Sequence, residues 1–188
     1  MSNNKLFRTA GWCALVGALS MILAVVSFIF SGAAPFAGMV GMIFEIIGLL
    51  LLIFVFYALS VAHRSESKWL GLAGMLLLIA AIVVDVVDQQ NSSTFLSGLW
   101  YLLFSLPFLI FGFLAFRSAR MPRGLAVLAL LAGGIGFIAG VAGWLVSLDM
   151  ADNLNTLSIP FMLAWEVWLW RVLLSKKFAV ASPVPVAA

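Results

Sequence analysis

The sequence predicts an all-helical integral membrane protein that crosses a bilayer six times. Of its 188 residues, 65% are hydrophobic and only 9% are charged, which leaves too little polar surface to cover a water-soluble globule. The apolar residues gather in six runs, each long enough to cross ~30 Å of hydrocarbon at ~1.5 Å per residue. The basic residues flank the runs at alternate ends. These observations predict a single bundle of six transmembrane helices.

Each run can be justified in order along the chain. The first is too long for the apolar region of a cleaved signal peptide. The second and fourth are heavy in aromatic residues, the first and fifth are rich in Ala and Gly, the third ends in aspartates, and the sixth contains a glutamate and three tryptophans. The six runs are 9–30, 36–62, 69–87, 95–116, 125–148 and 157–174.

The basic residues predict the orientation of the chain. They precede the first run, separate the second from the third and the fourth from the fifth, and close the sixth. An even number of crossings brings both termini to one side, and the positive-inside rule places that side in the cytoplasm. The basic residues are Lys5, Arg8, Arg64, Lys68, Arg117, Arg120, Arg123, Arg171, Lys176 and Lys177.

The remaining length leaves no room for a soluble domain. We expect residues 1–178 to form one transmembrane domain and residues 179–188 to form a Pro/Ala-rich C-terminal tail. The pI near 9.4 does not indicate nucleic-acid binding, because the basic residues lie at membrane edges where anionic head groups explain them. The expected environment is the lipid bilayer, with a membrane-protein partner or a second copy of the chain as its neighbour.

The fifth run contains a close-packing motif. Gly136 and Gly140 form a G-x-x-x-G pair, which exposes backbone on one helix face and allows a short interhelical distance. Packing within the bundle is favoured over dimerisation, because a six-helix chain supplies its own partners.

Two glutamates, Glu45 and Glu166, lie well inside apolar runs at similar predicted depth. A charged side chain at a helix centre costs about 2.5–3.5 kcal/mol on insertion scales, so both are expected to face the interior. They are either protonated or hydrogen-bonded to backbone and hydroxyl groups. A proton or cation relay and interhelical hydrogen bonding both remain open as roles.

Three tryptophans lie close to Glu166 in the sequence: Trp165, Trp168 and Trp170. Such aromatic surroundings can shape a pocket for a lipid-like or quinone-like ligand, and lipid-facing packing is the commoner explanation.

Four aspartates are expected at the outer ends of the third and fifth helices: Asp85, Asp88, Asp149 and Asp152. The i, i+3 spacing puts each pair on one helix face. Carboxylates are unfavourable at helix C-termini, and a divalent cation could offset the repulsion. Hydrated carboxylates at the membrane rim are the favoured alternative.

The sequence holds few groups for catalysis. His63 is the one histidine and lies beside Arg64, where we expect it to contact lipid head groups. Nucleophile–base and metal-ligand motifs of known enzymes are not found, and Cys13 is the one cysteine. We therefore expect neither an enzyme nor a bound metal or cofactor.

The last helix carries a proline, a mid-helix glutamate and a Leu-Trp pair within the segment 159–170, and the N-terminal segment 8–11 reads Arg-Thr-Ala-Gly. In these features the chain resembles an uncharacterised bacterial multi-span family, the domain of unknown function four-three-eight-six. The resemblance implies a multi-pass protein of the inner (plasma) membrane and no specific activity. The sequence departs from the family at Arg171, where an apolar residue is expected.

Two functional hypotheses follow. The first is a non-enzymatic accessory or scaffold subunit that packs against other membrane proteins, which the Gly-rich faces and the lack of catalytic groups favour. The alternative is a small proton- or cation-coupled carrier or sensor that uses Glu45 and Glu166.

Overall fold

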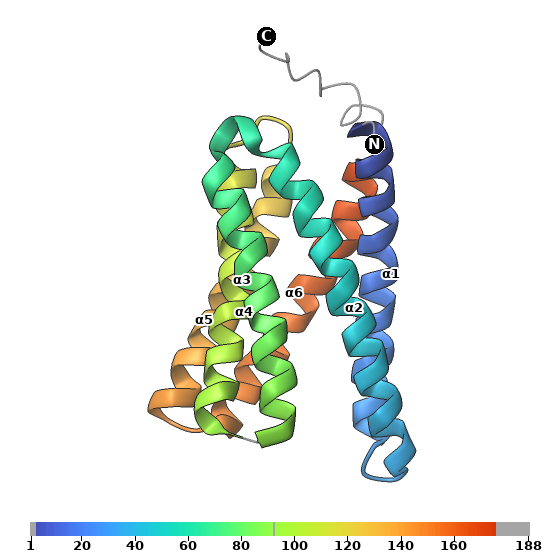
Figure 1. Ribbon diagram of the computed structural model, residues 1–188, viewed down its shortest axis with the longest axis vertical. Coiled ribbons are helices and arrows are strands. Elements are labelled where there is room, and N and C mark those ends of the chain that lie inside the picture. Colours follow the sequence, from blue (N-terminus) through green and yellow to red (C-terminus); the bar gives the residue numbers. More distant parts are fainter. Residues whose placement is uncertain (1–2, 92, 176–188) are drawn as a thin grey trace. The chain divides into compact units, whose positions relative to one another are not determined.

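The computed structural model describes residues 3–91 and 93–175, and the regular structure in this part of the chain is all helical (Figure 1). Each helix is long and apolar enough to cross a membrane, which confirms the predicted all-α fold with six spans. The tail at 179–188, with Lys176 and Lys177, lies outside the described residues. The helices are α1 (Asn3–Phe30), α2 (Pro35–Ala62), α3 (Arg64–Asn91), α4 (Thr94–Arg117), α5 (Arg123–Leu145) and α6 (Leu148–Leu174).

The described residues form two compact units. The first unit contains the chain up to Ala58 and the part of α6 from Glu166 onward, and the second runs from Leu59 to Trp165. The first therefore holds α1, most of α2 and the end of α6. The second holds α3, α4, α5 and the beginning of α6.

In the first unit, helices approach one another at glycines. A Cβ atom built on Gly48 of α2 would lie 2.9 Å from the Met21 sulfur of α1. One on Gly11 of α1 would lie 3.3 Å from the Leu174 side chain of α6. Because apolar burial gives little advantage between helices in lipid, such close van der Waals contact is a main source of helix association.

The second unit is held together by the glycine face of α5. A Cβ atom on Gly140 would meet Leu102 of α4 at 2.6 Å, and one on Gly133 would meet Leu109 at 2.9 Å. Gly136 faces the Ser105 hydroxyl, also on α4. The structure therefore uses the G-x-x-x-G face of α5 for packing against the preceding helix.

Serine residues start the membrane-crossing parts of α3 and α6. Ser67 interrupts α3 with extended backbone angles, φ −168° and ψ 107°, and its hydroxyl accepts a hydrogen bond from the Leu70 N–H. The hydroxyl of Ser147 likewise accepts from the Met150 N–H, at 3.2 Å. Both serines occupy the N-cap position, where a side-chain oxygen satisfies an amide that the helix leaves unpaired.

Because α6 begins directly after Ser147, two aspartates lie at a different helix end from the one predicted. The fifth helix ends at Leu145 instead of Leu148, and α6 begins at Leu148 instead of Leu157. Asp149 and Asp152 therefore lie in the first two turns of α6, and not at the end of the fifth helix. A carboxylate at a helix N-terminus is stabilised by the helix dipole, so the expected repulsion does not arise there.

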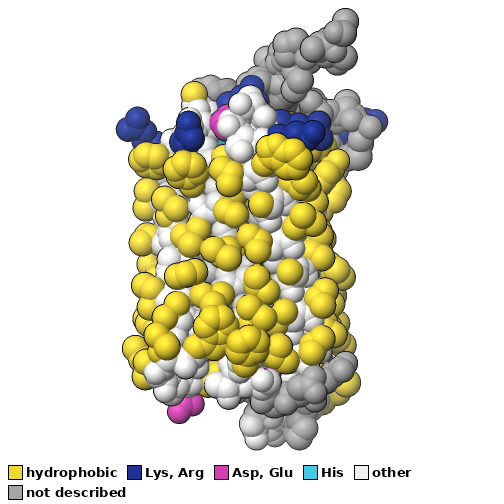
Figure 2. Space-filling model, turned by 60° about the vertical axis from the view of Figure 1, so that its left-hand side comes forward, with side chains coloured by type: hydrophobic (Ala, Val, Ile, Leu, Met, Phe, Trp, Pro, Cys, Tyr) yellow, Lys and Arg dark blue, Asp and Glu magenta, His cyan; other side chains and the backbone are white. Residues whose placement is uncertain are grey.

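The surface matches a lipid environment. Figure 2 shows hydrophobic side chains covering most of the visible surface of the helices. Large apolar residues are strongly exposed near helix ends, including Trp69 at 75% and Leu145 at 78%. Exposed apolar residues on every helix would aggregate in water and are satisfied by acyl chains. The protein is a multi-pass membrane protein.

Candidate functional site

Glu166 is the buried carboxyl group of the first unit. Helix α6 carries it, and the residue is only 2% exposed. Its Oε2 atom finds no hydrogen-bond partner within the described part of the chain. The same atom lies 3.7 Å from the position that a Cβ atom on Gly17 would occupy, and the Gly48 carbonyl oxygen lies 3.8 Å from that position. Gly17 of α1 therefore leaves room beside the carboxyl group.

Glu45 lies on α2, one helical turn before Gly48, and is half-buried. Residues three apart share a helix face, so Glu45 and Gly48 lie on the same side of α2. Glu45 also has an interaction partner of its own. The two intramembrane glutamates thus differ: Glu45 is partnered, and one oxygen of Glu166 is not.

The three tryptophans near Glu166 have different settings. Trp165 is 2% exposed and packs edge-on against Phe108 within the second unit, with ring centroids 5.2 Å apart. The ring centroids of Trp170 and Trp12 of α1 lie 6.0 Å apart in the first unit. The Trp168 side chain is 39% exposed. Consecutive residues of a helix point about 100° apart, so three indoles at these spacings take different directions.

Three of the four aspartates have partners within the protein. Asp88 accepts hydrogen bonds from the Ser93 N–H at 2.9 Å and from the Ser97 hydroxyl at 2.5 Å, which ties the end of α3 to the start of α4. Asp152 accepts from the Tyr101 hydroxyl at 2.5 Å, which ties α6 to α4. Asp85 is half-buried and also has a partner, and Asp149 is exposed.

These partners leave little to support a cation site. Among residues 3–91 and 93–175, no group of three or more His, Cys, Asp or Glu side chains is placed to hold a metal ion. Asp88 and Asp152 instead join helix ends through hydroxyl and amide donors.

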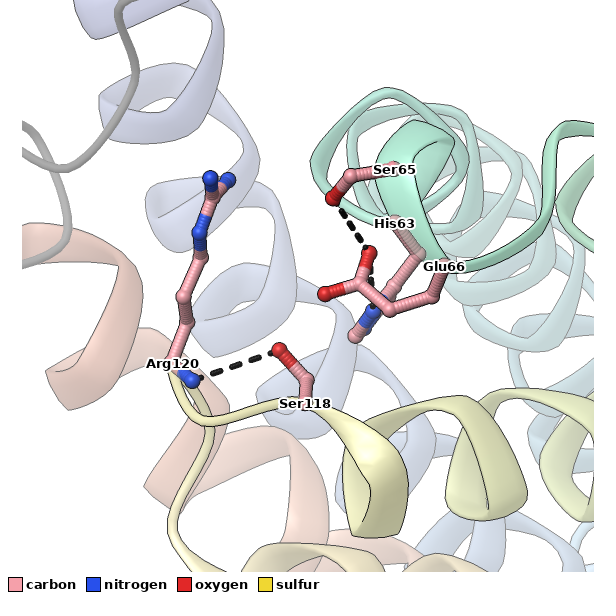
Figure 3. Close-up of polar contacts among 5 residues, drawn as sticks. All are labelled: His63, Ser65, Glu66, Ser118 and Arg120. Carbon is pink, nitrogen blue, oxygen red and sulfur yellow. Dashed lines mark hydrogen bonds and ion pairs between the residues drawn. The ribbon is translucent and has the colours of Figure 1, made fainter.

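A second buried titratable group, His63, lies in the second unit where the α2–α3 connection meets the α4–α5 connection (Figure 3). His63 is 1% exposed, which contradicts its expected contact with lipid head groups. Its Nδ1 atom lies 3.7 Å from the Glu66 Oε2 atom. That distance is too long for a hydrogen bond. The Phe111 ring of α4 lies 6.4 Å away.

Three polar side chains complete the His63 cluster, which we define as His63, Glu66, Ser65, Ser118 and Arg120. The Ser65 hydroxyl donates a 2.8 Å hydrogen bond to Glu66. The Ser118 hydroxyl accepts one from the Arg120 N–H at 3.2 Å. The cluster thus brings the His63 imidazole and the Glu66 carboxylate close to the segment that joins α4 to α5, while the Arg120 guanidinium points away from them (Figure 3).

Burial lowers the pKa of His63 below its ordinary value of 6.5, because the desolvated ring disfavours the charged form. Glu66 opposes this shift through its negative charge, while Arg120 adds to it through its positive charge. A pKa below 6.5 keeps the ring neutral at pH 7.

Sequence reasoning found Glu166 and missed the His63 cluster. A glutamate within an apolar run is conspicuous, whereas a histidine in a basic connection looks like a surface residue. One sequence feature favours the burial of His63: the residue directly follows Ala62, the last residue of an apolar run.

Comparison with protein-family models, with curated proteins and with solved structures finds no match to this chain. The resemblance of the last helix to the domain of unknown function four-three-eight-six stays a prediction.

Proposed function

We propose that this chain is a non-enzymatic membrane protein that binds and releases a proton at Glu166, as a small proton-coupled carrier or sensor of the bacterial inner membrane. The observation that carries the proposal is the buried Glu166 carboxyl group, whose Oε2 has no hydrogen-bond partner among the described residues. Intramembrane carboxyl groups are enriched at proton and ion pathways.

The chemistry explains how a proton at Glu166 can be coupled to another event. An unpaired carboxylate in apolar surroundings is very unfavourable. Loss of the proton must therefore accompany the arrival of water or a cation, or a change in packing. Gly17 beside the carboxyl group allows such a change, because the nearest atoms to the position of its missing Cβ lie at ordinary van der Waals distances of 3.7–3.8 Å. Glu45 is the acidic residue of α2 and lies on the same face of that helix as Gly48.

The accessory-subunit hypothesis has less support. The Gly136–Gly140 face, which favoured it, is occupied by Leu102 and Ser105 of α4. The C-terminal tail lies outside the described residues. Extraction under mild conditions separates the two hypotheses: a stable stoichiometric membrane-protein partner favours the accessory role, and a monodisperse single protein favours the carrier or sensor.

Proton binding can be tested directly by infrared spectroscopy on the purified protein in liposomes. We expect a protonated-carboxyl band that disappears as pH rises and that is missing in Glu166→Gln. Asp149→Asn serves as the matched control, since that aspartate is exposed. A band that stays unchanged across the titration, or that persists in Glu166→Gln, would overturn the proposal.

A second measurement distinguishes a carrier from a sensor. Liposomes loaded with a pH-sensitive dye are given a potassium diffusion potential, and internal acidification is followed. Proton flux that is lost in Glu166→Gln and retained in Asp149→Asn identifies a carrier. A titrating Glu166 without flux identifies a sensor.

A further inference from the structure

The His63 cluster contains a buried base at a junction between two short connections. His63 lies between the end of α2 and the start of α3. Ser118 and Arg120 belong to the segment that joins α4 to α5. All lie in the second unit. The junction is therefore one compact feature, built from residues more than fifty positions apart in the chain.

The imidazole of His63 is unusual in its lack of hydrogen bonds. Neither Nδ1 nor Nε2 has a partner among the residues described, although both atoms are buried. A buried polar atom without a hydrogen-bond partner is less stable than the same atom in water. Movement that admits water would restore those hydrogen bonds.

Two charged groups act on the ring from different sides. Glu66, from the first turn of α3, attracts a protonated ring, and Arg120, from the α4–α5 connection, repels it. Phe111 of α4 contributes an uncharged aromatic face. A protonated ring is therefore attracted to Glu66 on α3 and repelled by Arg120 on the α4–α5 connection.

We propose that His63 is a proton-operated latch: as a neutral buried ring it keeps the α2–α3 and α4–α5 connections together, and when protonated it separates them. This device is independent of Glu166, which lies in the other unit.

Opening follows from the physics of a buried cation. An imidazolium ion in the closed junction has lost its hydration and lies near the positive charge of Arg120. Separation of the connections hydrates the ring and increases its distance from Arg120, while the Glu66 carboxylate stays beside it on α3. The open state therefore binds the proton more tightly than the closed state, and a fall in pH shifts the population toward it.

The first experiment uses the fact that the chain has one histidine. The protein is purified with a histidine-free tag, labelled with 15N-histidine and placed in lipid nanodiscs, and the imidazole nitrogens are titrated by NMR. We expect one transition with its midpoint below 6.5. Glu66→Gln should lower the midpoint and Arg120→Gln should raise it, whereas Arg123→Gln is the matched control that leaves it in place. A titration midpoint that is unchanged in both Glu66→Gln and Arg120→Gln would overturn the latch proposal.

The second experiment measures the opening itself. Spin labels are attached to Arg64→Cys and Ala119→Cys in a Cys13→Ala background, since both labelled positions are exposed and lie on opposite connections. The distance between the labels should increase on acidification with the same midpoint as the NMR titration. His63→Gln should abolish this change. A constant distance through the titration, or an equal change in His63→Gln, contradicts the proposal.

Discussion

At the scale of single residues, Glu166 and His63 show two ways of burying a titratable group. Glu166 lies within a transmembrane helix beside glycines, and His63 lies at a junction of connections beside charged partners. In both, at least one polar atom has no hydrogen-bond partner within residues 3–91 and 93–175. In the folded protein each of these unpaired atoms has lost its hydrogen bonds to water, and perturbed titratable groups of this kind cluster at functional sites.

Replacing Glu166 with methionine should stabilise the protein. Methionine fills a similar volume without the unpaired oxygen, so we expect the free energy of unfolding to rise by about 1 kcal/mol. Glu166→Ala leaves a cavity and should be less stable than Glu166→Met. Unfolding in mixed micelles measures both, and a lower stability of the methionine variant would show that the carboxyl group contributes favourable contacts.

The stability of the protein should fall in mild acid because of His63. Its pKa is lowered in the folded state, so between that pKa and about 6.5 the unfolded chain binds more protons. The contribution of the neutral ring is complete above pH 6.5 and is lost as pH falls through this window. Unfolding midpoints measured between pH 8 and pH 5 should show the decline, with a shallower slope in His63→Gln. Equal slopes would contradict the assignment.

The Tyr101–Asp152 hydrogen bond offers a test of helix-end contacts. Tyr101→Phe removes the donor to a carboxylate, and we expect a loss of about 1.5–3 kcal/mol. Asp152→Asn keeps an acceptor and should lose less. Thermal unfolding in detergent compares the two variants, and an unchanged Tyr101→Phe would mean that water replaces the bond.

At the scale of elements, the glycines of α5 set the distance between α4 and α5. A methyl group on Gly140 would lie 2.9 Å from the Leu102 backbone nitrogen, which has little freedom to move. Gly140→Ala should therefore destabilise the protein by about 1–3 kcal/mol.

Gly134 provides the matched control for that substitution on the same helix. Nothing among the described residues lies within 4 Å of its Cβ position, so Gly134→Ala should raise stability by about 0.5–1 kcal/mol through helix propensity alone. Unfolding of the two variants under identical conditions gives the comparison. Equal effects would exclude close packing as the reason for the glycines.

The sequence predicted the helices well and the start of α6 poorly. Long apolar runs are unambiguous, but the polar segment after Leu148 was taken as a connection. Polar residues can be helical at a membrane edge, and the Ser147-Leu148-Asp149 sequence is a typical helix start. At this position the local capping signal marks the start of α6 better than hydrophobicity does.

Of the two candidate sites, the position of Glu166 could be predicted from the sequence and the burial of His63 could not. The interior position of Glu166 follows from the free energy of insertion, which depends on the residue alone. Burial of His63 depends on packing between the α2–α3 and α4–α5 connections, and no periodicity in the sequence encodes that meeting.

At the scale of the whole molecule, the orientation stays a prediction that labelling can test. Within the second unit, Arg64, Lys68 and Arg123 lie where α3 and α5 begin, and Arg117 and Arg120 lie where α4 ends or has just ended. We expect Ala119→Cys to be labelled from the cytoplasm and Asn153→Cys from the opposite side, in a Cys13→Ala background. Labelling of both from one side would contradict six crossings.

The short link between α5 and α6 bears on how the chain enters the bilayer during synthesis. Only Val146 and Ser147 separate the two helices, and the first turns of α6 carry Asp149, Asp152 and Asn153. A segment that begins with such residues partitions weakly into lipid by itself. Because the link has only two residues, we expect α5 and α6 to enter the membrane together as one hairpin, with the strongly apolar α5 providing most of the favourable free energy of insertion.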